Sequence, residues 1–294
     1  MGAIHLSIAF QPEWFDVLQA PFMRNAFIGG SMVALAAGLI GYFVIVRGNA
    51  FAAHALAHIG FPGATLAVLL GISVTGGLLV FTLGGALAIG VLGKKASERE
   101  IATGTVLAFA TALGVLFASL ATTGSTTVTN VLFGNLLAIA PDQLVLFGGL
   151  TAAMMIALGI VFRPLLFASI DPQVAEAKGL PVRLLGIVFM VLLAFAITMS
   201  VQVVGTLLLF GLVVTPSATA LMITQRPSRV IMLGTALSLA SVWTGLVLAA
   251  MFNLPPSFFI ISIATAAWLI TMFATRRRRR ARPMAHHGHG DHQT

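Results

Sequence analysis

The chain has 294 residues, of which 59% are hydrophobic and only 8% are charged, with a formal net charge of +8. Soluble domains carry about 25% charged residues, so this chain has too few charges to cover a water-soluble surface, and disorder is excluded for the same reason. We therefore predict an all-α, polytopic integral membrane protein, because lipid leaves open backbone groups unsatisfied and barrel strands would alternate in polarity.

The first segment, residues 1–20, is expected at the outer membrane surface. Residues 11–20 mix aromatic and aliphatic side chains with Glu13 and Asp16, which is typical of an interfacial helix. The first 20 residues contain no Lys or Arg and so lack the basic start of a signal peptide. We expect this segment to be retained.

Residues 21–275 form the predicted transmembrane domain. A spanning helix needs about 20 mostly apolar residues. The apolar stretches predict about nine transmembrane helices, with eight possible because several stretches are short or rich in glycine. They lie at about 25–46, 51–72, 74–92, 101–120, 142–162, 183–200, 203–223, 229–252 and 256–274.

The basic residues predict the orientation in the membrane. With nine spans, the loops that follow odd-numbered spans hold all but one of the 16 Lys and Arg, and the opposite side holds only Arg24. The positive-inside rule then places the N-terminus outside and the C-terminus inside a plasma membrane. A basic run directly after an apolar stretch, such as Arg276 to Arg280, is more typical of such a topology signal than of nucleic-acid binding.

A histidine pair in the second span is the first candidate site. His54 and His58 are four residues apart, which puts both imidazoles on one helical face about one turn apart. Two imidazoles can share one transition-metal ion, and a symmetry-related copy or water could complete its coordination. Alternatively, each histidine donates a hydrogen bond to a neighbouring helix. Both interpretations stay open on the residues alone.

Acidic residues are absent from the middle of the predicted spans. Ion-coupled carriers usually depend on intramembrane ionisable groups, commonly carboxylates. The absence of such carboxylates weighs against a carrier, and it places the energy source for uphill transport on another subunit.

The polar residues 121–135 are expected to form an outer loop with a short re-entrant piece.

Residues 171–179, DPQVAEAKG, predict a short helix on the inner face. Asp171 is a favoured N-cap, Pro172 suits the first helical position, and Gly179 suits the left-handed position after the helix. Such a helix could dock into a groove on a cytoplasmic partner. The plainer interpretation is an ordinary capped loop helix.

Thr215 and Pro216 fall inside the seventh span. Proline removes a helix hydrogen bond and frees a carbonyl, so this site is either a gate hinge on a pathway or a packing kink.

The tail, residues 276–294, is rich in arginine and histidine and is expected in the cytoplasm. The arginine run should anchor the last span to anionic lipid. Four tail histidines could bind zinc, nickel or copper weakly, although the composition favours a passive solvated tail. They are His286, His287, His289 and His292.

Three stretches of the chain resemble one known family. GNAFAAHALAHIGFPG (48–63), SIDPQVAEAKGLP (169–181) and VVGTLLLFGLVVTPSATALMIT (203–224) are similar, in this order and spacing, to segments of the membrane permease subunits of ABC importers for zinc, manganese and related divalent metals. The resemblance covers about residues 20–275.

This resemblance implies a type II ABC importer-like permease fold and a role without enzyme activity of its own. A cytoplasmic ABC ATPase would hydrolyse ATP and dock on residues 171–179, with Asp171, Ala175 and Gly179 as coupling residues. It also implies an extracytoplasmic metal-binding protein and a second permease subunit, which we expect to be another copy. The transported ion takes the place of any bound cofactor.

The resemblance also bears on which metal is carried. Many relatives have an aspartate at the position of His54 and keep the histidine four residues later. Two imidazoles favour zinc over manganese, which prefers oxygen ligands, so zinc is the expected cargo, with manganese or iron next. The alternatives are an ion-coupled or passive metal transporter that works without an ATPase, and a permease for a metal chelate, which would generally be longer.

Overall fold

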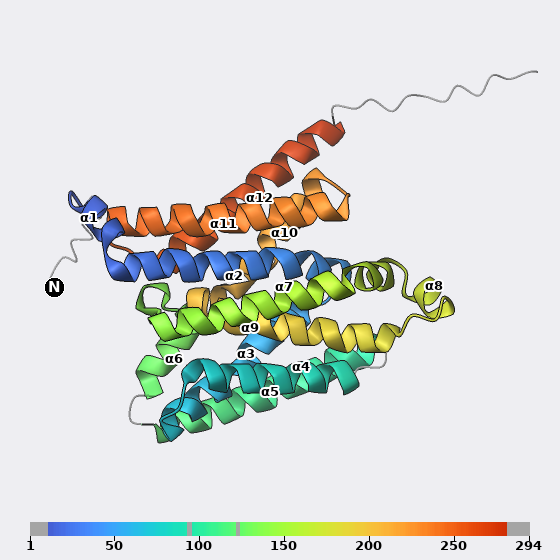
Figure 1. The fold of residues 1–294 in the computed structure, drawn as a ribbon, viewed down its shortest axis with the longest axis horizontal. Helices are drawn as coiled ribbons and strands as arrows, with labels where there is room; N and C mark the ends of the chain where they lie inside the picture. Colours follow the sequence, from blue (N-terminus) through green and yellow to red (C-terminus); the bar gives the residue numbers. More distant parts are fainter. Residues whose placement is uncertain (1–10, 93–95, 122–123, 281–294) are drawn as a thin grey trace, which may run out of the picture.

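The computed structural model describes residues 11–92, 96–121 and 124–280, and these residues form helices and turns with no strand among them (Figure 1). The all-α prediction is confirmed. In chain order the elements are α1 Trp14–Gln19, α2 Pro21–Val46, α3 Ala50–Leu70, α4 Val74–Leu92, α5 Ala96–Leu120, α6 Gly124–Phe133, the 3-10 helix η1 Leu136–Ala138, α7 Pro141–Ile170, α8 Pro172–Ala177, α9 Val182–Val213, α10 Thr215–Ile223, α11 Pro227–Phe252 and α12 Pro256–Arg280.

Eight of the described helical segments are long and apolar enough to cross a membrane. The difference from the nine predicted stretches lies in Val182–Ile223, which is continuous and 42 residues long. A straight helix of that length would measure about 63 Å, roughly twice the thickness of the hydrocarbon core. The segment is not one straight helix, because it folds back at Gly205. The φ of 81° and ψ of 168° at this residue are not helical.

The fold-back places both ends of Val182–Ile223 at one end of the molecule. Its middle lies at the other end, where the Gln202 carboxamide oxygen accepts a hydrogen bond from Thr75 at the start of α4 (3.0 Å). The backbone N–H of Asn135, just after α6, donates to the Gln202 carbonyl (2.9 Å). The predicted stretches 183–200 and 203–223 therefore correspond to the two arms of one bent segment.

The polar region before α7 also differs from a simple loop. It contains α6, a ten-residue helix that is too short to span and that packs against α9, followed by η1. The predicted short piece at this position is thus helical and supports the fold-back.

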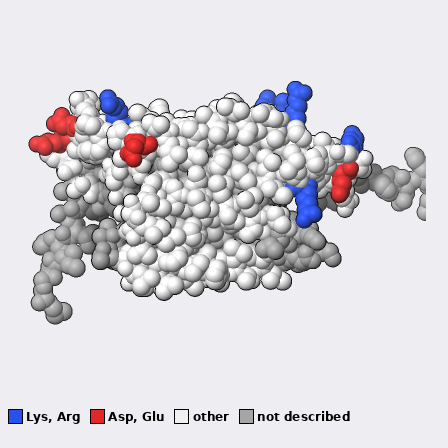
Figure 2. All heavy atoms as spheres, turned by 60° about the horizontal axis from the view of Figure 1, so that its bottom comes forward, with Lys and Arg blue, Asp and Glu red and all other residues white. Residues whose placement is uncertain are grey.

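Charged side chains gather at the two ends of the bundle. Figure 2 shows charged atoms of both signs at each end of the drawn face, acidic ones mainly at one end and basic ones mainly at the other, with an uncharged band between the two ends. We call the end that carries α8 the α8 end, and the opposite end, where α1 packs against α2 and α11, the α1 end. The uncharged band is the part that lipid would surround.

A helix is present within residues 11–20, as predicted, and is α1; Gln11 N–H donates to the Met251 carbonyl at the end of α11 (2.9 Å). Residues 1–10 of that segment lie outside the described part of the chain.

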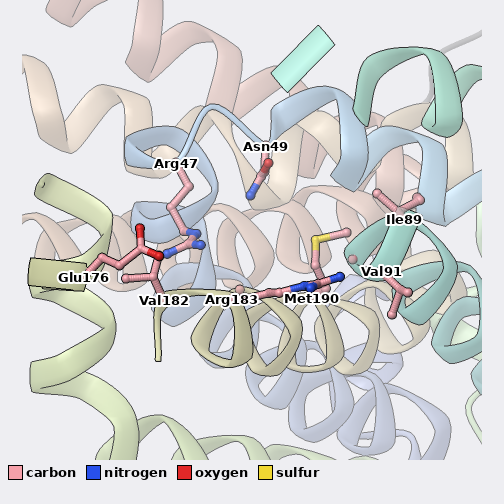
Figure 3. Close-up of a pocket in the computed structure, with 10 residues that line it drawn as sticks. Arg47, Asn49, Ile89, Val91, Glu176, Val182, Arg183 and Met190 are labelled. Atoms are coloured by element: carbon pink, nitrogen blue, oxygen red, sulfur yellow. The ribbon is translucent and has the colours of Figure 1, made fainter. Parts of the chain in front are cut away.

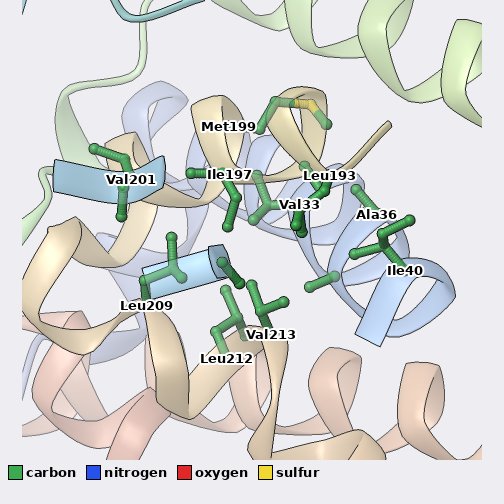
Figure 4. Close-up of a cluster of buried hydrophobic side chains, with 14 of the residues drawn as sticks. Val33, Ala36, Ile40, Leu193, Ile197, Met199, Val201, Leu209, Leu212 and Val213 are labelled. Carbon is green, nitrogen blue, oxygen red and sulfur yellow. The ribbon is translucent and has the colours of Figure 1, made fainter. Parts of the chain in front are cut away.

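The core forms where the two arms of the fold-back meet α2. Figure 4 shows Val33, Ala36 and Ile40 of α2 among side chains from both arms, including Leu193, Ile197, Leu209 and Val213. All of these side chains are fully buried. The branched and small side chains let three helical segments approach closely, and α9 of this core also packs against α3 and α4.

Candidate functional site

The histidine pair lies on α3, one and two turns after the helix begins at the α8 end. The imidazole ring centroids of His54 and His58 are 4.8 Å apart, with the ring planes at 72°. Both side chains are partly exposed, whereas their neighbours Ala55, Leu56 and Ala57 are fully buried. The predicted common face is therefore present, and the rest of the chain covers it only in part.

The pair supplies two nitrogen donors and no complete metal shell. Within the described residues, no group of three or more His, Asp or Glu side chains could hold a metal ion. Neither imidazole donates a hydrogen bond to another described residue. Because zinc prefers four ligands, half of its coordination would have to come from water or from a second chain.

The segment predicted as a docking helix is α8, which projects beyond the other helices at the α8 end (Figure 1). The Asp171 carboxylate accepts a hydrogen bond from Val174 N–H (3.0 Å) and Pro172 occupies the first turn. At the other end Gly179 has a φ of 79°, and its N–H donates to the Glu176 carbonyl (2.9 Å). These are the caps predicted from the sequence.

One side of α8 is anchored and the other side is open. Ala175 is fully buried, and the Lys178 ammonium lies 5.3 Å from the centre of the Phe167 ring of α7. Val174 is 42% exposed, an apolar side chain presented on a helix that stands away from the bundle. An exposed apolar residue on a short, capped helix is suited to insertion into a groove of another protein.

A cavity of about 370 Å³ lies beside α8 (Figure 3). It separates α8 from the turn between α2 and α3 and from the ends of α4 and α9. In the view of Figure 3 the Glu176 carboxylate points toward the Arg47 guanidinium, and both residues line this cavity. The lining residues include Arg47, Asn49, Ile89, Glu176, Arg183 and Met190.

Thr215 and Pro216 lie where α9 passes into α10. Thr215 is the first residue of α10, and Pro216, which is buried, follows it in the first turn. Since proline has no N–H, the helical ladder is interrupted here, and the break is assigned at Val214. These two residues are far in sequence from the histidine pair and the structure gives them no contact with it.

A polar cluster at the α1 end was missed by the sequence analysis. Four of the chain's twelve Asn and Gln side chains, Asn130, Asn135, Gln143 and Gln202, line one cavity of about 180 Å³ between α4, α6, α7 and α9. The Gln202 carboxamide oxygen accepts from Thr75 and from Gln143 (3.3 Å). The only sign of this cluster in the sequence is that isolated Asn and Gln residues occur within or beside apolar stretches. Their convergence depends on the fold-back.

The tail histidines His286, His287, His289 and His292 lie outside the described residues.

Comparisons with known proteins agree on one family. The model of the ABC 3 transport family matches residues 19–275. The manganese transport system membrane protein MntC of Listeria innocua is 31% identical over 263 residues, which cover 89% of this chain and 94% of that protein. The manganese import system permease protein ScaB of Streptococcus gordonii is 29% identical over 259 residues, covering 88% and 93%.

Two solved structures have the same architecture. PsaBC from Streptococcus pneumoniae, in complex with a Fab, matches with a TM-score of 0.81 and 31% identity over 91% of this chain and 97% of that one. An inward-facing putative metal-chelate type ABC transporter matches with a TM-score of 0.65 at 15% identity, which is a likeness of fold.

Proposed function

This chain belongs to the ABC 3 transport family, and from that premise we propose that it forms the pathway for a divalent first-row metal ion, with zinc as the best-fitting cargo. The protein is a multi-pass permease subunit of the plasma membrane and not an enzyme, since ATP hydrolysis belongs to a separate subunit of such importers. The observation that carries the proposal is the pair of partly exposed imidazoles on α3, whose ring centroids are 4.8 Å apart.

Two nitrogen donors at this spacing suit zinc. Manganese, which the names of the relatives specify, is the second candidate and prefers oxygen donors. The experiment that tests the cargo is uptake by the reconstituted complex of permease, ATPase and binding protein, with zinc and manganese supplied separately and in competition. A higher uptake efficiency for manganese than for zinc would contradict zinc as the preferred ion.

Replacing His54 with aspartate should move selectivity toward manganese. The change exchanges a nitrogen donor for a carboxylate oxygen while His58 stays, so the ratio of manganese to zinc uptake should rise about tenfold. His54→Asn is the matched control, because asparagine has nearly the same shape as aspartate but carries no charge. An unchanged ratio in His54→Asp would show that this position does not contact the ion.

We propose that the missing ligands come from a second copy of the chain. The pair is partly exposed in the single chain, and a two-fold axis beside α3 would bring two such pairs to one pathway. The α8 end then faces the cytoplasm and the ATPase, and the α1 end faces the extracytoplasmic binding protein. Gradient-driven uptake by the isolated chain, without ATP, would contradict the proposal that the protein works with an ATPase.

For the tail histidines we propose only weak metal binding.

We propose that α8 is the ATPase docking helix, with Asp171, Ala175 and Gly179 holding its shape. We also propose that Thr215 and Pro216 form a kink beside the pathway.

Replacing Gly179 with valine should reduce transport several-fold. A β-branched residue is strained at a φ of 79° by about 1–2 kcal/mol, and a helix of six residues has few other contacts to hold it.

Gly179→Asn is the matched control for that prediction, since asparagine tolerates the left-handed conformation. A side chain meets open space at this position, so any effect comes from the backbone. The measurement is metal uptake together with the amount of ATPase that co-purifies. Equal transport by the valine and asparagine variants would remove the role assigned to the cap.

A further inference from the structure

Arg47 occupies the turn that joins α2 to α3. The turn is tight: Gly48 N–H donates to the Ile45 carbonyl (3.0 Å) and Asn49 N–H to the Val44 carbonyl (2.8 Å), and the Asn49 carbonyl accepts from Ala53 N–H in the first turn of α3. These hydrogen bonds join the Arg47 turn directly to the start of α3, the helix that carries the histidine pair.

The Arg47 side chain holds this turn to the two helices that flank α8 in the chain. Its Nη1 donates to the Ser169 hydroxyl at the end of α7 (3.1 Å), and the guanidinium carbon lies 5.2 Å from the centre of the Phe189 ring on α9. Ser169 lies two residues before Asp171, the cap of α8. Arg47 thus connects the α8 region with α3 across 122 positions in sequence.

A carboxylate that could also bind the guanidinium lines the same cavity. Glu176 is on α8, and its carboxylate points toward Arg47 in Figure 3. The cavity between α8 and the turn leaves room for α8 to approach. A guanidinium has five donors in a fixed planar fork, so it can exchange a hydroxyl partner for a carboxylate without losing its stacking on an aromatic ring.

We propose that Arg47 is a positioning residue that couples α8 to the metal pathway. When the ATPase moves α8 toward the cavity, Arg47 exchanges Ser169 for Glu176, and the tight turn shifts α3 and its two histidines. Two arrangements of one charged side chain supply the bistable element that such coupling needs. This inference rests on the proposed docking of the ATPase on α8.

The test is made on the full complex of permease, ATPase and binding protein in proteoliposomes. The measured quantity is the number of ATP molecules hydrolysed per metal ion transported. Arg47→Met keeps the length of the side chain and removes its charge and donors. We expect the ratio to rise about tenfold, because hydrogen bonds to charged groups are the strong ones, with basal ATP hydrolysis and co-purification of the ATPase unchanged.

Three further variants sharpen the result. Arg47→Lys keeps the charge but loses the planar fork, so its ratio should lie between those of the wild type and Arg47→Met. Arg229→Met is the matched control, because it removes an exposed arginine from the same end of the molecule. Its ratio should be that of the wild type. Ser169→Ala leaves Arg47 and Phe189 in place and should raise the ratio about threefold.

The outcomes separate the inference from its premise. A wild-type complex that transports no metal would overturn the proposed function itself. If transport and ATP hydrolysis fall in proportion in Arg47→Met, the residue is only structural and the inference is wrong. If Arg47→Met does not assemble, Ser169→Ala decides, and an unchanged ratio in that variant overturns the proposal.

Discussion

Replacing both His54 and His58 with alanine is expected to abolish metal uptake, lowering it by at least about 100-fold, because even the outer partners of metal ligands cost 10–100-fold when removed. The two imidazoles are the only metal-binding groups that the described part of α3 offers, and they lie 4.8 Å apart on one face. If the pair lines the proposed pathway, its loss removes the two groups of α3 that would replace the water that an entering ion must shed.

This loss should be confined to transport. The imidazoles are partly exposed and donate no hydrogen bond to the rest of the described chain, so truncating them removes little packing. The double variant should assemble with the ATPase and retain basal ATP hydrolysis. Leu70→Ala, which truncates an exposed side chain on the same helix, serves as the control and should transport normally. Wild-type uptake by the double variant would reduce the pair to surface side chains.

Local features of the site could be predicted from the sequence because they depend on neighbours in the chain. The shared face of His54 and His58 follows from a spacing of four residues in a helix. The caps of α8 follow from the backbone preferences of Asp171, Pro172 and Gly179. The membrane class follows from composition alone.

Features that depend on distant residues could not be predicted in this way. The contact between Arg47 and Ser169 joins positions 122 residues apart, and the cavity beside α8 depends on how four elements meet. In the sequence, the fold-back corresponds only to two separate apolar stretches, 183–200 and 203–223. Nothing local distinguishes Gly205 from the many other glycines of the chain, because its backbone conformation is imposed by the segment packed against it.

Replacing Gly205 with alanine is expected to destabilise the protein by about 3 kcal/mol or more, since strain in a glycine-only backbone region costs 1–3 kcal/mol and a steric clash adds to it. With a φ of 81° and a ψ of 168°, Gly205 lies in that region. A Cβ there would fall against the carbonyl oxygen of Leu132 and only 2.5 Å from the carbonyl carbons of Leu132 and Phe133, which are backbone atoms at the end of α6.

The contact is reciprocal, which is why relaxation cannot relieve it. Gly134 has a φ of 74°, and a Cβ on it would lie 2.7 Å from the Val203 carbonyl carbon and from the backbone nitrogen of Gly205. The two backbones are also tied by the hydrogen bond from Asn135 N–H to the Gln202 carbonyl (2.9 Å). Neither segment can retreat without breaking that bond and opening the polar cluster around Gln202.

Thermal unfolding of the detergent-purified protein measures the effect, and Gly149→Ala is the control. Gly149 is a helical glycine of α7 with no atom within 4 Å of an added Cβ, so alanine there should be neutral or stabilising by up to about 1 kcal/mol. The two substitutions add the same methyl group, but only Gly205→Ala should lower the midpoint of unfolding. Equal midpoints would mean that the fold-back tolerates a side chain, and the close backbone contact with α6 would then not be what holds the two arms of Val182–Ile223 together.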